Sequence, residues 1–407
     1  MRVLLVNDYA TLAGGAETSL AAVRAGLRAR GHSVRWFSTT ARSSAGPRLA
    51  DAVGRGTTSA ARALLQAANP WAAAALRREL ATFQPDVVHV KVFLTQLSPL
   101  ILPVLRGWPS LYHAAWYRAV CPVGTKRLPT GAACQHAWGR ACLQEGCLPL
   151  RDWLPLEAQR GLLRRWRGAF GAVIANSEST RCRLAEGGWP VTAVIPNGTP
   201  PQPARPPLSD PPLVVFAGRL VPEKGADMLL RAFAAVHAAL PEARLLIAGE
   251  GPERPALEAL AAQLGLTAAV TWAGYVPPDE LERRLAPAWV QVVPSQWDEP
   301  FGQVAIEAMM RGTAVLASRA GGLADVVRDG QTGRLLPPGD EAAWTAALLE
   351  ALRGRERAEQ WGAAGRAVAL AEYTLDRQLD RLLAVYHTLA ARAQPVPAAG
   401  RAESARS

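Results

Sequence analysis

The sequence is poor in cysteine and in lysine. Its 407 residues contain five cysteines, and only three of its 45 basic residues are lysines, namely Lys91, Lys126 and Lys224. So few cysteines, without a recognisable export signal, argue against a disulfide framework and indicate a reducing compartment. Because almost all other basic residues are arginines, a lysine at a given position is less likely to be incidental.

Long apolar runs are also missing. The longest, such as residues 97–105, are broken by prolines and fall short of the roughly 20 residues that a helix needs to cross a bilayer. At the N-terminus, the apolar run Val3–Val6 is followed at once by Asn7 and Asp8, which is too short for the core of a signal peptide. We therefore expect a cytoplasmic chain with no membrane span.

The composition is that of an ordinary globular protein, but its charge is unevenly distributed. Hydrophobic residues make up 49% and charged residues 19%, and the length suits two or three domains. Residues 1–200 hold 24 Lys and Arg against 10 Asp and Glu, whereas residues 201–407 hold 21 against 24. A basic first half favours an anionic membrane surface or an anionic acceptor, and the alternative is an arginine-rich solvated surface. No block of like charge resembles a nucleic-acid-binding arm, so we expect no nucleic-acid partner.

Two α/β halves are predicted. Short apolar, β-branched runs that predict buried parallel strands alternate with helical stretches, the first of which spans Glu17–Arg30. In the first half these runs are Val3–Val6, Val34–Phe37, Val87–Val90, Ser110–His113, Val173–Asn176 and Val194–Pro196. In the second half they are Leu213–Gly218, Arg244–Gly249, Val270–Gly274, Val290–Ser295 and Ala314–Ser318.

The remaining segments predict a linker and a C-terminal helix. Residues 199–212 contain seven prolines, which is typical of a stiff extended linker. Residues 374–393 carry an amphipathic apolar stripe that must pack on another element, and residues 394–407 resemble a disordered tail.

Four of the five cysteines lie close together in the first half. Cys121, Cys134, Cys142 and Cys147 fall within 27 residues, in an insertion that we place at residues 118–150. Four thiolates can form a structural zinc site, although the paired C-x-x-C spacing of such sites is absent. The alternative is a set of free thiols that pack an irregular loop.

The clearest candidate site is a pair of acids separated by seven residues. Glu299 falls in the loop after a predicted strand, and Glu307 falls in the helix that begins near Gly302. The start of that helix offers free N–H groups to an anion, and Gly302 permits close backbone approach. One carboxylate can then bind sugar hydroxyls and the other a ribose diol; two solvated surface acids are the alternative.

A second candidate loop carries cations at a strand end. In the segment Gly218–Gly225, the planar guanidinium of Arg219 can bind two phosphate oxygens at once, and the ammonium of Lys224 adds a compact positive charge. Together the two groups suit a diphosphate. The Gly-Lys-Ser/Thr order of a P-loop is absent, and Gly249-Glu250-Gly251 lacks the third glycine of a dinucleotide fingerprint. A dehydrogenase is thus not favoured.

Together these motifs resemble the retaining glycosyltransferases of the GT-B fold, specifically glycosyltransferase family four. The motifs are Glu299 to Glu307, the Arg219 and Lys224 loop, Gly14 to Glu17, and Pro196 to Gly198, in the family's order. The resemblance implies two doubly wound Rossmann-like domains that face a cleft, with a C-terminal helix crossing back. Residues 1–198 would bind the acceptor and residues 213–373 the nucleotide sugar.

The resemblance also implies roles for single residues. Arg219 and Lys224 would neutralise the diphosphate, Glu307 would bind the ribose, and Glu299 would hold the donor sugar. The backbone of Phe301, Gly302, Gln303 and Val304 would assist Glu299, Gly14 and Gly15 would approach the diphosphate, and the base would lie near Glu250 and Tyr275. His113 ends a strand where the family commonly has a His-Asp pair, but Ala114 replaces the Asp, so His113 would touch either donor or acceptor.

The implied reaction needs no metal or other cofactor. Cations and helix N-termini would stabilise the leaving diphosphate, and the departing phosphate would take the acceptor's proton. The expected donor is a UDP-, GDP- or ADP-sugar, and the expected acceptor is a sugar or a lipid-linked or polysaccharide intermediate of the cell envelope, used at the inner face of the membrane. A nucleotide-sugar epimerase or hydrolase, and a non-catalytic nucleotide-sugar-binding scaffold, are the alternatives.

Overall fold

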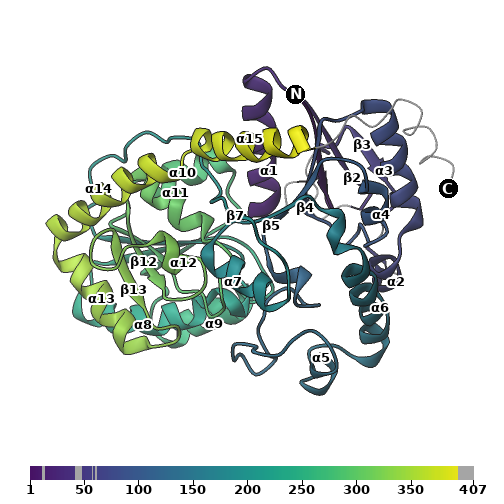
Figure 1. Cartoon of the computed structure of the whole chain (residues 1–407). Coiled ribbons are helices and arrows are strands. Elements are labelled where there is room, and N and C mark those ends of the chain that lie inside the picture. The colour runs from purple at the N-terminus through teal and green to yellow at the C-terminus, as the bar shows by residue number, and fades with distance from the viewer. Residues whose placement is uncertain (12–13, 42–47, 57, 60–61, 393–407) are drawn as a thin grey trace. The chain divides into compact units, whose positions relative to one another are not determined.

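The computed structural model describes residues 1–11, 14–41, 48–56, 58–59 and 62–392, so the tail predicted for residues 394–407 lies outside the described residues. The chain divides into two compact units (Figure 1). Unit 1 comprises Met1–Gly198 and the segment from Leu375 onward, and unit 2 comprises Thr199–Thr374.

Unit 1 is built around a parallel sheet of seven strands in the order β3-β2-β1-β4-β5-β6-β7. Its strands are β1 (Arg2–Asn7), β2 (Ser33–Thr39), β3 (Ala52–Gly54), β4 (Val87–Val92), β5 (Ser110–Ala114), β6 (Ala172–Ala175) and β7 (Ala193–Val194). Its helices are α1 (Gly15–Ala29), α2 (Arg62–Ala67), α3 (Pro70–Phe83), α4 (Ile101–Leu105), α5 (Ala141–Gln144), α6 (Leu150–Trp166), α7 (Glu178–Glu186) and α15 (Leu375–Arg392), with 3-10 turns at Tyr117–Ala119 and Arg167–Ala169.

Unit 2 repeats the plan with six parallel strands in the order β10-β9-β8-β11-β12-β13. Its strands are β8 (Leu213–Ala217), β9 (Arg244–Ala248), β10 (Val270–Gly274), β11 (Val290–Val293), β12 (Ala314–Ser318) and β13 (Gly333–Leu336). Its helices are α8 (Ala226–Ala239), α9 (Arg254–Gln263), α10 (Pro278–Leu285), α11 (Gln303–Arg311), α12 (Leu323–Val326), α13 (Glu341–Arg353) and α14 (Arg355–Glu372), with a 3-10 turn at Pro222–Lys224.

The predicted fold class is confirmed, since both units are doubly wound parallel sheets. Every predicted strand is present, with ends that differ by at most two residues; β11, for example, ends at Val293 rather than Ser295. The first helix begins at Gly15, two residues before the predicted start. The sequence missed two short strands, β3 and β13, because three or four residues carry too little periodicity to be distinguished from a loop.

Local sequence explains several helix starts. Asn69 precedes Pro70 and its side chain accepts the N–H of Ala72 at 3.0 Å, and Ser177 accepts the N–H of Thr180 in the same way. These side chains satisfy backbone donors that have no partner within the helix. These caps fix the first residues of α3 and α7.

The proline-rich segment 199–212 packs along unit 2. The N–H of Thr199 donates to the carbonyl of Tyr373 at 2.9 Å, and that of Arg205 donates to the carbonyl of Arg311 at 2.9 Å. The Arg205 side chain donates to the carbonyl of Gly312 at 2.8 Å, and Leu208 is buried in the core of unit 2. The segment is extended, as its prolines predict, but it is tied to one unit and belongs to it.

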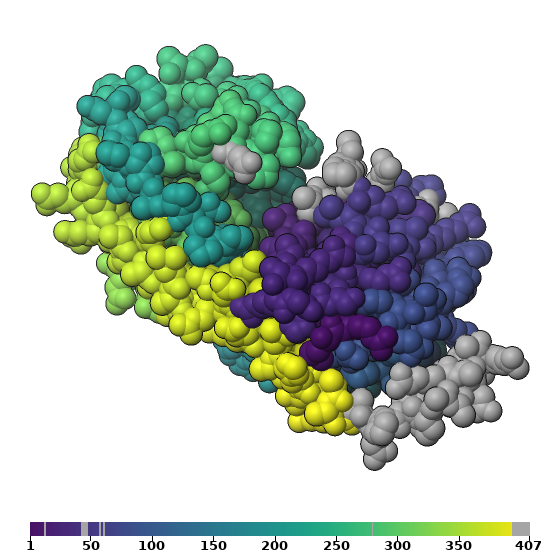
Figure 2. Space-filling view, turned by 90° about the horizontal axis from the view of Figure 1, so that it is seen from above, coloured from purple at the N-terminus to yellow at the C-terminus, as the bar shows by residue number. Residues whose placement is uncertain are grey.

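The last helix, α15, returns to unit 1. Leu379, Leu382 and Tyr386 pack in one cluster with Val3, Leu5 of β1 and Leu20 of α1. Figure 2 shows the yellow C-terminal segment lying against the purple N-terminal segment. A Cβ on Gly26 would stand 2.5 Å from Leu379 Cδ1, so α1 and α15 approach each other closely at this glycine.

Candidate functional site

The two predicted motifs of unit 2 meet at one point of its sheet. Lys224 follows β8, and Glu299 follows β11, which is the neighbour of β8 on the side where the strand order reverses. The Lys224 ammonium lies 2.7 Å from the Glu299 carboxylate. Ligands of doubly wound sheets bind at the carboxyl ends of the strands beside such a reversal. The contact thus joins two motifs that are 75 residues apart.

Glu299 is held by donors from its own loop. Its carboxylate accepts hydrogen bonds from Ser295 Oγ at 3.0 Å and from Trp297 Nε1 at 3.1 Å, besides the one from Lys224. The Trp297 ring also lies under the Lys224 ammonium, at 5.7 Å from the ring centroid. Ser295 and Trp297 are site residues that sequence reasoning missed, although both fall in the same loop.

Glycines let the loops of the site approach closely. Gly225 has φ of 69°, and a Cβ there would stand 2.1 Å from the carbonyl oxygen of Pro294. Gly321, in the loop after β12, has φ of 59°, and a Cβ there would stand 2.2 Å from the carbonyl oxygen of Glu299. The N–H of Gly322 donates to that same oxygen at 2.6 Å. The Gly321-Gly322 pair therefore sets the position of the Glu299 backbone, a role that the sequence analysis did not assign.

The segment Phe301–Val304 starts α11. Phe301 is buried and packs edge-on to Tyr373, Gly302 has φ of 95° at the N-cap, and Gln303 and Val304 are the first two helical residues. The first turn of a helix leaves N–H groups without a partner inside the helix. An anion or a sugar hydroxyl can occupy that end, as the resemblance implies.

Glu307 lies one turn into α11, half-buried. Burial, with the nearby Glu282 carboxylate, raises the pKa of Glu307 to about 7, while Arg311 and a hydrogen bond from Gln303 oppose that shift. The Gln303 amide also donates to Thr199 Oγ1 at 2.5 Å. The two acids of the motif therefore differ. Glu299 is paired with the Lys224 ammonium, and Glu307 can carry a proton near neutral pH.

The other predicted residues of unit 2 lie in the neighbouring loops. Arg219 follows β8, is exposed, and has no polar side-chain partner within the described residues. The N–H of Leu220 donates to the carbonyl of Glu250 at 2.9 Å, so the loops after β8 and β9 are joined. The Glu250 carboxylate pairs with Arg254, and Tyr275 after β10 is 79% exposed.

In unit 1, Gly14 and Gly15 start α1 and are exposed. Glu17, two residues on, is buried and accepts a hydrogen bond from Asn7 at 3.2 Å. Burial raises the pKa of Glu17. Asp8, at the end of β1, accepts the backbone N–H groups of Thr95, Gln96 and Leu97, which fixes the loop after β4 against the loop after β1.

His113, which the resemblance implies would touch the donor or the acceptor, lies in the interior of unit 1. Its side chain is fully buried, its Nδ1 lies 3.2 Å from His89 Nε2, and its Nε2 has no partner within the described residues. His89 in turn contacts the Tyr386 hydroxyl of α15 at 2.6 Å. Burial lowers the pKa of His89 to about 3 and that of His113 well below its usual value. The returning helix α15 contacts His89 of this pair through Tyr386, and the contact of His113 with donor or acceptor stays a prediction.

A buried lysine accompanies the histidines. The Lys91 ammonium donates to Ser19 Oγ at 2.9 Å and to Asn197 Oδ1 at 3.2 Å, and burial lowers its pKa to about 7. The sequence analysis noted Lys91 for its rarity only. Its position between Val90 and Val92 of β4 carries no motif, and only the fold brings it to α1 and Asn197.

The four clustered cysteines are free thiols in this structure. Burial raises the pKa of the Cys142 thiol, and the neighbouring Cys121 and Cys134 contribute to the shift. Within the described residues, no group of three or more His, Cys, Asp and Glu side chains is placed so that it could hold a metal ion. The side-chain positions thus do not support the zinc site, which stays a prediction.

Known proteins match both halves of the chain. Residues 13–202 match the family described as Glycosyltransferase Family 4, and residues 201–368 match the one described as Glycosyl transferases group 1. The GDP-mannose-dependent alpha-(1-6)-phosphatidylinositol monomannoside mannosyltransferase of Mycolicibacterium smegmatis is 34% identical over 278 residues, which are 63% of this chain and 72% of that protein. The chain belongs to glycosyltransferase family four. It is an enzyme that transfers a sugar from a nucleotide sugar to an acceptor.

Another relative matches over a shorter part of its length, whereas solved structures match over almost all of theirs. The D-inositol 3-phosphate glycosyltransferase of Nocardia farcinica is 43% identical over 165 residues, and this chain spans 36% of it. Among solved structures, the sucrose-phosphate synthase of Thermosynechococcus elongatus has a TM-score of 0.72 at 24% identity, covering 96% of this chain and 99% of that one. HepE of Anabaena, solved with UDP and glucose, has a TM-score of 0.69 at 18% identity over 95% of this chain and 100% of that one. These structures establish the GT-B fold of this glycosyltransferase.

Of the helices in the described part of the chain, none is both long and apolar enough to cross a membrane.

Proposed function

We propose that unit 2 binds the nucleotide sugar at the Lys224–Glu299 contact and that unit 1 binds the acceptor, with transfer that retains the anomeric configuration. The 2.7 Å contact between Lys224 and Glu299 is the observation that carries this proposal. The proposal is supported by a cation and a carboxylate lying side by side at the sheet position where doubly wound folds bind ligands; the cation would serve the diphosphate and the carboxylate the sugar hydroxyls.

The proposed roles follow from the surroundings of each residue. Arg219 is exposed and has no polar side-chain partner within the described residues, so its planar guanidinium is available to two phosphate oxygens. Lys224 would share its charge between the phosphates and Glu299. Glu299 is fixed by Ser295 and Trp297 and would accept hydrogen bonds from the donor sugar. Glu307 would bind the ribose diol, and the start of α11 would face the phosphates.

In the proposed reaction, the acceptor oxygen attacks the anomeric carbon from the face that the diphosphate leaves. The bond between the anomeric carbon and the diphosphate oxygen breaks, and the departing phosphate takes the acceptor's proton. Arg219, Lys224 and the helix N-terminus stabilise the negative charge that develops on the diphosphate. Neither Glu299 nor Glu307 is assigned as a nucleophile, and no metal or cofactor takes part.

We further propose that the acceptor is anionic or lipid-linked, belongs to the cell envelope and is met at the cytoplasmic face of a membrane. The relative from Mycolicibacterium smegmatis is named for a phosphatidylinositol acceptor, and residues 1–200 of this chain are strongly basic. Five of the seven exposed large hydrophobic side chains among the described residues also lie in unit 1. They are Leu64, Trp71, Val123, Leu150 and Leu154. Basic charge with exposed apolar side chains is typical of proteins that bind anionic bilayers.

The experiment that tests the donor proposal measures release of nucleoside diphosphate from a panel of UDP-, GDP- and ADP-sugars. GDP-mannose comes first because relatives from Mycolicibacterium smegmatis and Mycobacterium tuberculosis are named for it. We expect release from one donor, and a loss of about 100-fold or more in both Lys224→Ala and Glu299→Gln. Glu356→Gln, an exposed position on α14, is the matched control and should keep full activity.

Two results would count against the proposal. If no donor raises the melting temperature, the donor site is wrongly placed. If the sugar is released or epimerised at the same rate with and without acceptors, a hydrolase or epimerase replaces the transferase.

A further inference from the structure

Unit 1 contains a basic cavity that the reaction above does not use. It encloses about 500 Å³ between the cysteine-rich segment and the C-terminal halves of α6 and α7. Among its lining residues Glu186 is the one carboxylate. The cations that line it are Lys126, Arg160, Arg164, Arg167 and Arg183.

The cavity shares no lining residue with the sites described above. Helix α6 ends where the chain enters β6, and α7 ends where it enters β7, so this wall lies at the amino ends of the strands. The opposite wall belongs to the segment that follows the carboxyl end of β5. Gly14, Gly15 and the loop after β4 do not line the cavity, which is therefore distinct from them.

Two of the five cations already have carboxylate partners. Arg160 donates to Glu157 at 2.9 and 2.5 Å, and Arg183 lies 3.3 Å from Glu186. Their charges are thus neutralised without a ligand.

The other three cations have no carboxylate partner within the described residues. Lys126 is 6% exposed and its ammonium donates to the carbonyl of His136 at 2.8 Å. Arg167 donates to the carbonyl of Gly187 at 3.2 Å, and Arg164 has no hydrogen bond or ion pair among the residues that the structure describes. Of the three, Lys126 is buried, Arg167 is partly exposed and Arg164 is exposed. A buried charge without a counter-ion is costly, so an anion beside Lys126 would stabilise this arrangement.

Aromatic and apolar side chains form part of the remaining wall, together with Gln135 and His136. Trp138, Leu163 and Trp189 line the cavity, and the buried Trp138 Nε1 has no acceptor within the described residues. Trp189 Nε1 donates to the carbonyl of Ala119 at 3.4 Å. A volume of this size, with apolar surface beside convergent polar groups, is large enough for a small molecule.

We propose that this cavity binds a phosphate monoester, carried either by a soluble small molecule or by a lipid headgroup. Three uncompensated cations match the charge of about −2 on such a group better than the single charge of a carboxylate. Arginine forks bind phosphate oxygens in pairs, and the tryptophan wall would contact the carbon part of the ligand. Because the site is separate from the donor site, its test does not depend on sugar transfer.

The test has a soluble arm and a membrane arm. Calorimetry measures binding of glycerol 3-phosphate, and cosedimentation measures binding to phosphatidylcholine vesicles with and without phosphatidic acid. The variants are Arg164→Glu and Arg167→Gln. Because Arg164 is exposed, its substitution should not affect folding. Arg165→Glu is the matched control, since Arg165 is the next residue of α6, is exposed, and does not line the cavity.

We expect Arg164→Glu and Arg167→Gln to weaken binding at least about tenfold, and Arg165→Glu to change it less than about twofold. Loss in the calorimetric arm would identify a soluble ligand, and loss only in the phosphatidic-acid arm would identify a lipid. The proposal is overturned if neither probe binds, if Arg165→Glu weakens binding as much as Arg164→Glu, or if Lys224→Ala abolishes binding of glycerol 3-phosphate.

Discussion

At the scale of single residues, the two acids of the donor motif have opposite surroundings. Glu299 accepts hydrogen bonds from Lys224, Ser295 and Trp297. Glu307 is half-buried beside Glu282, and its pKa rises to about 7. The protein therefore loses stability when Glu307 ionises, unless a ligand supplies hydroxyl donors to that carboxylate.

This difference predicts the pH dependence of the Glu307→Gln variant. A carboxyl whose pKa rises on folding stabilises the protein fully below its usual pKa of 4.5, and that stability is lost as the pH rises through about 7. Glu307→Gln should therefore melt at a higher temperature than the unsubstituted protein at about pH 8, and the difference should shrink toward about pH 5. Donor binding should weaken at both pH values.

Thermal melts at the two pH values check this, with Glu356→Gln as a control that should not change the pH dependence. Equal melting temperatures of Glu307→Gln and the unsubstituted protein at high pH would contradict it.

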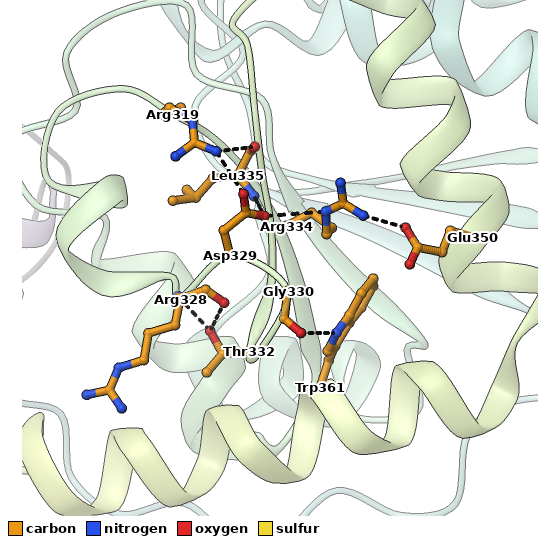
Figure 3. Close-up of polar contacts among 9 residues, drawn as sticks. All are labelled: Arg319, Arg328, Asp329, Gly330, Thr332, Arg334, Leu335, Glu350 and Trp361. Atoms are coloured by element: carbon orange, nitrogen blue, oxygen red, sulfur yellow. Dashed lines mark hydrogen bonds and ion pairs between the residues drawn. The ribbon is translucent and has the colours of Figure 1, made fainter.

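At the scale of elements, the short strand β13 depends on one carboxylate (Figure 3). Asp329 accepts the N–H of Leu335 at 3.0 Å and pairs with Arg319 at 2.8 Å and Arg334 at 3.3 Å. Thr332 Oγ1 accepts the N–H of Arg328 at 2.9 Å, and Trp361 of α14 donates to the carbonyl of Gly330 at 3.1 Å. The turn before β13 is thus closed by side chains, which holds a strand of four residues at the edge of the sheet.

Asp329→Ala should therefore destabilise unit 2 at neutral pH by about 1 to 3 kcal/mol. Burial alone would raise the pKa of Asp329, but the Leu335 N–H and the two arginines lower it below 3.8 overall. A carboxyl whose pKa is lowered on folding stabilises the protein when the pH is above the usual pKa of that carboxyl. This stability is lost as the pH falls through the lower pKa that the carboxyl has in the folded protein.

Urea unfolding at neutral and at acid pH measures this, and the difference between Asp329→Ala and the unsubstituted protein should shrink in acid. Asp329→Asn keeps an acceptor for Leu335 but loses the ion pairs, so its stability should fall between the two. A loss that is the same at all pH values would show that the charge of Asp329 does not matter.

At the scale of the whole molecule, the charge asymmetry of the sequence coincides with the division into units. The basic excess belongs to residues 1–200, which form most of unit 1, and most of the exposed large hydrophobic side chains lie on the same unit. Unit 1 is therefore the unit that we expect to contact an anionic membrane.

Replacing three exposed arginines of unit 1 by glutamine, at Arg78, Arg106 and Arg140, should weaken binding to vesicles of phosphatidylcholine with phosphatidylglycerol. Each lost charge contributes on the order of 1 kcal/mol at such a surface, and added salt should weaken binding further. Cosedimentation measures the effect. The matched control replaces Arg283, Arg353 and Arg357 of unit 2 and should bind normally. Equal binding to vesicles without anionic lipid would contradict the proposal.

The sequence by itself determined the two α/β halves, the eleven strands of strong apolar character and the order of the donor motifs. These features depend on neighbouring residues, whose periodicity and glycine positions are visible in the chain. It could not show the contacts between distant loops. The pairing of Lys224 with Glu299 was expected only as a shared site, and Gly321, Ser295 and Trp297 were not assigned at all.

The tertiary structure alone decided the rest. It buried His113 against His89 under Tyr386, brought Lys91 to Asn197, and tied the proline-rich segment to unit 2. It also brought Lys126 to Arg164 and Arg167, so that residues from two separate segments line one cavity. The physical reason is that burial and charge compensation depend on which segments pack together, and packing joins residues whose separation along the chain carries no pattern.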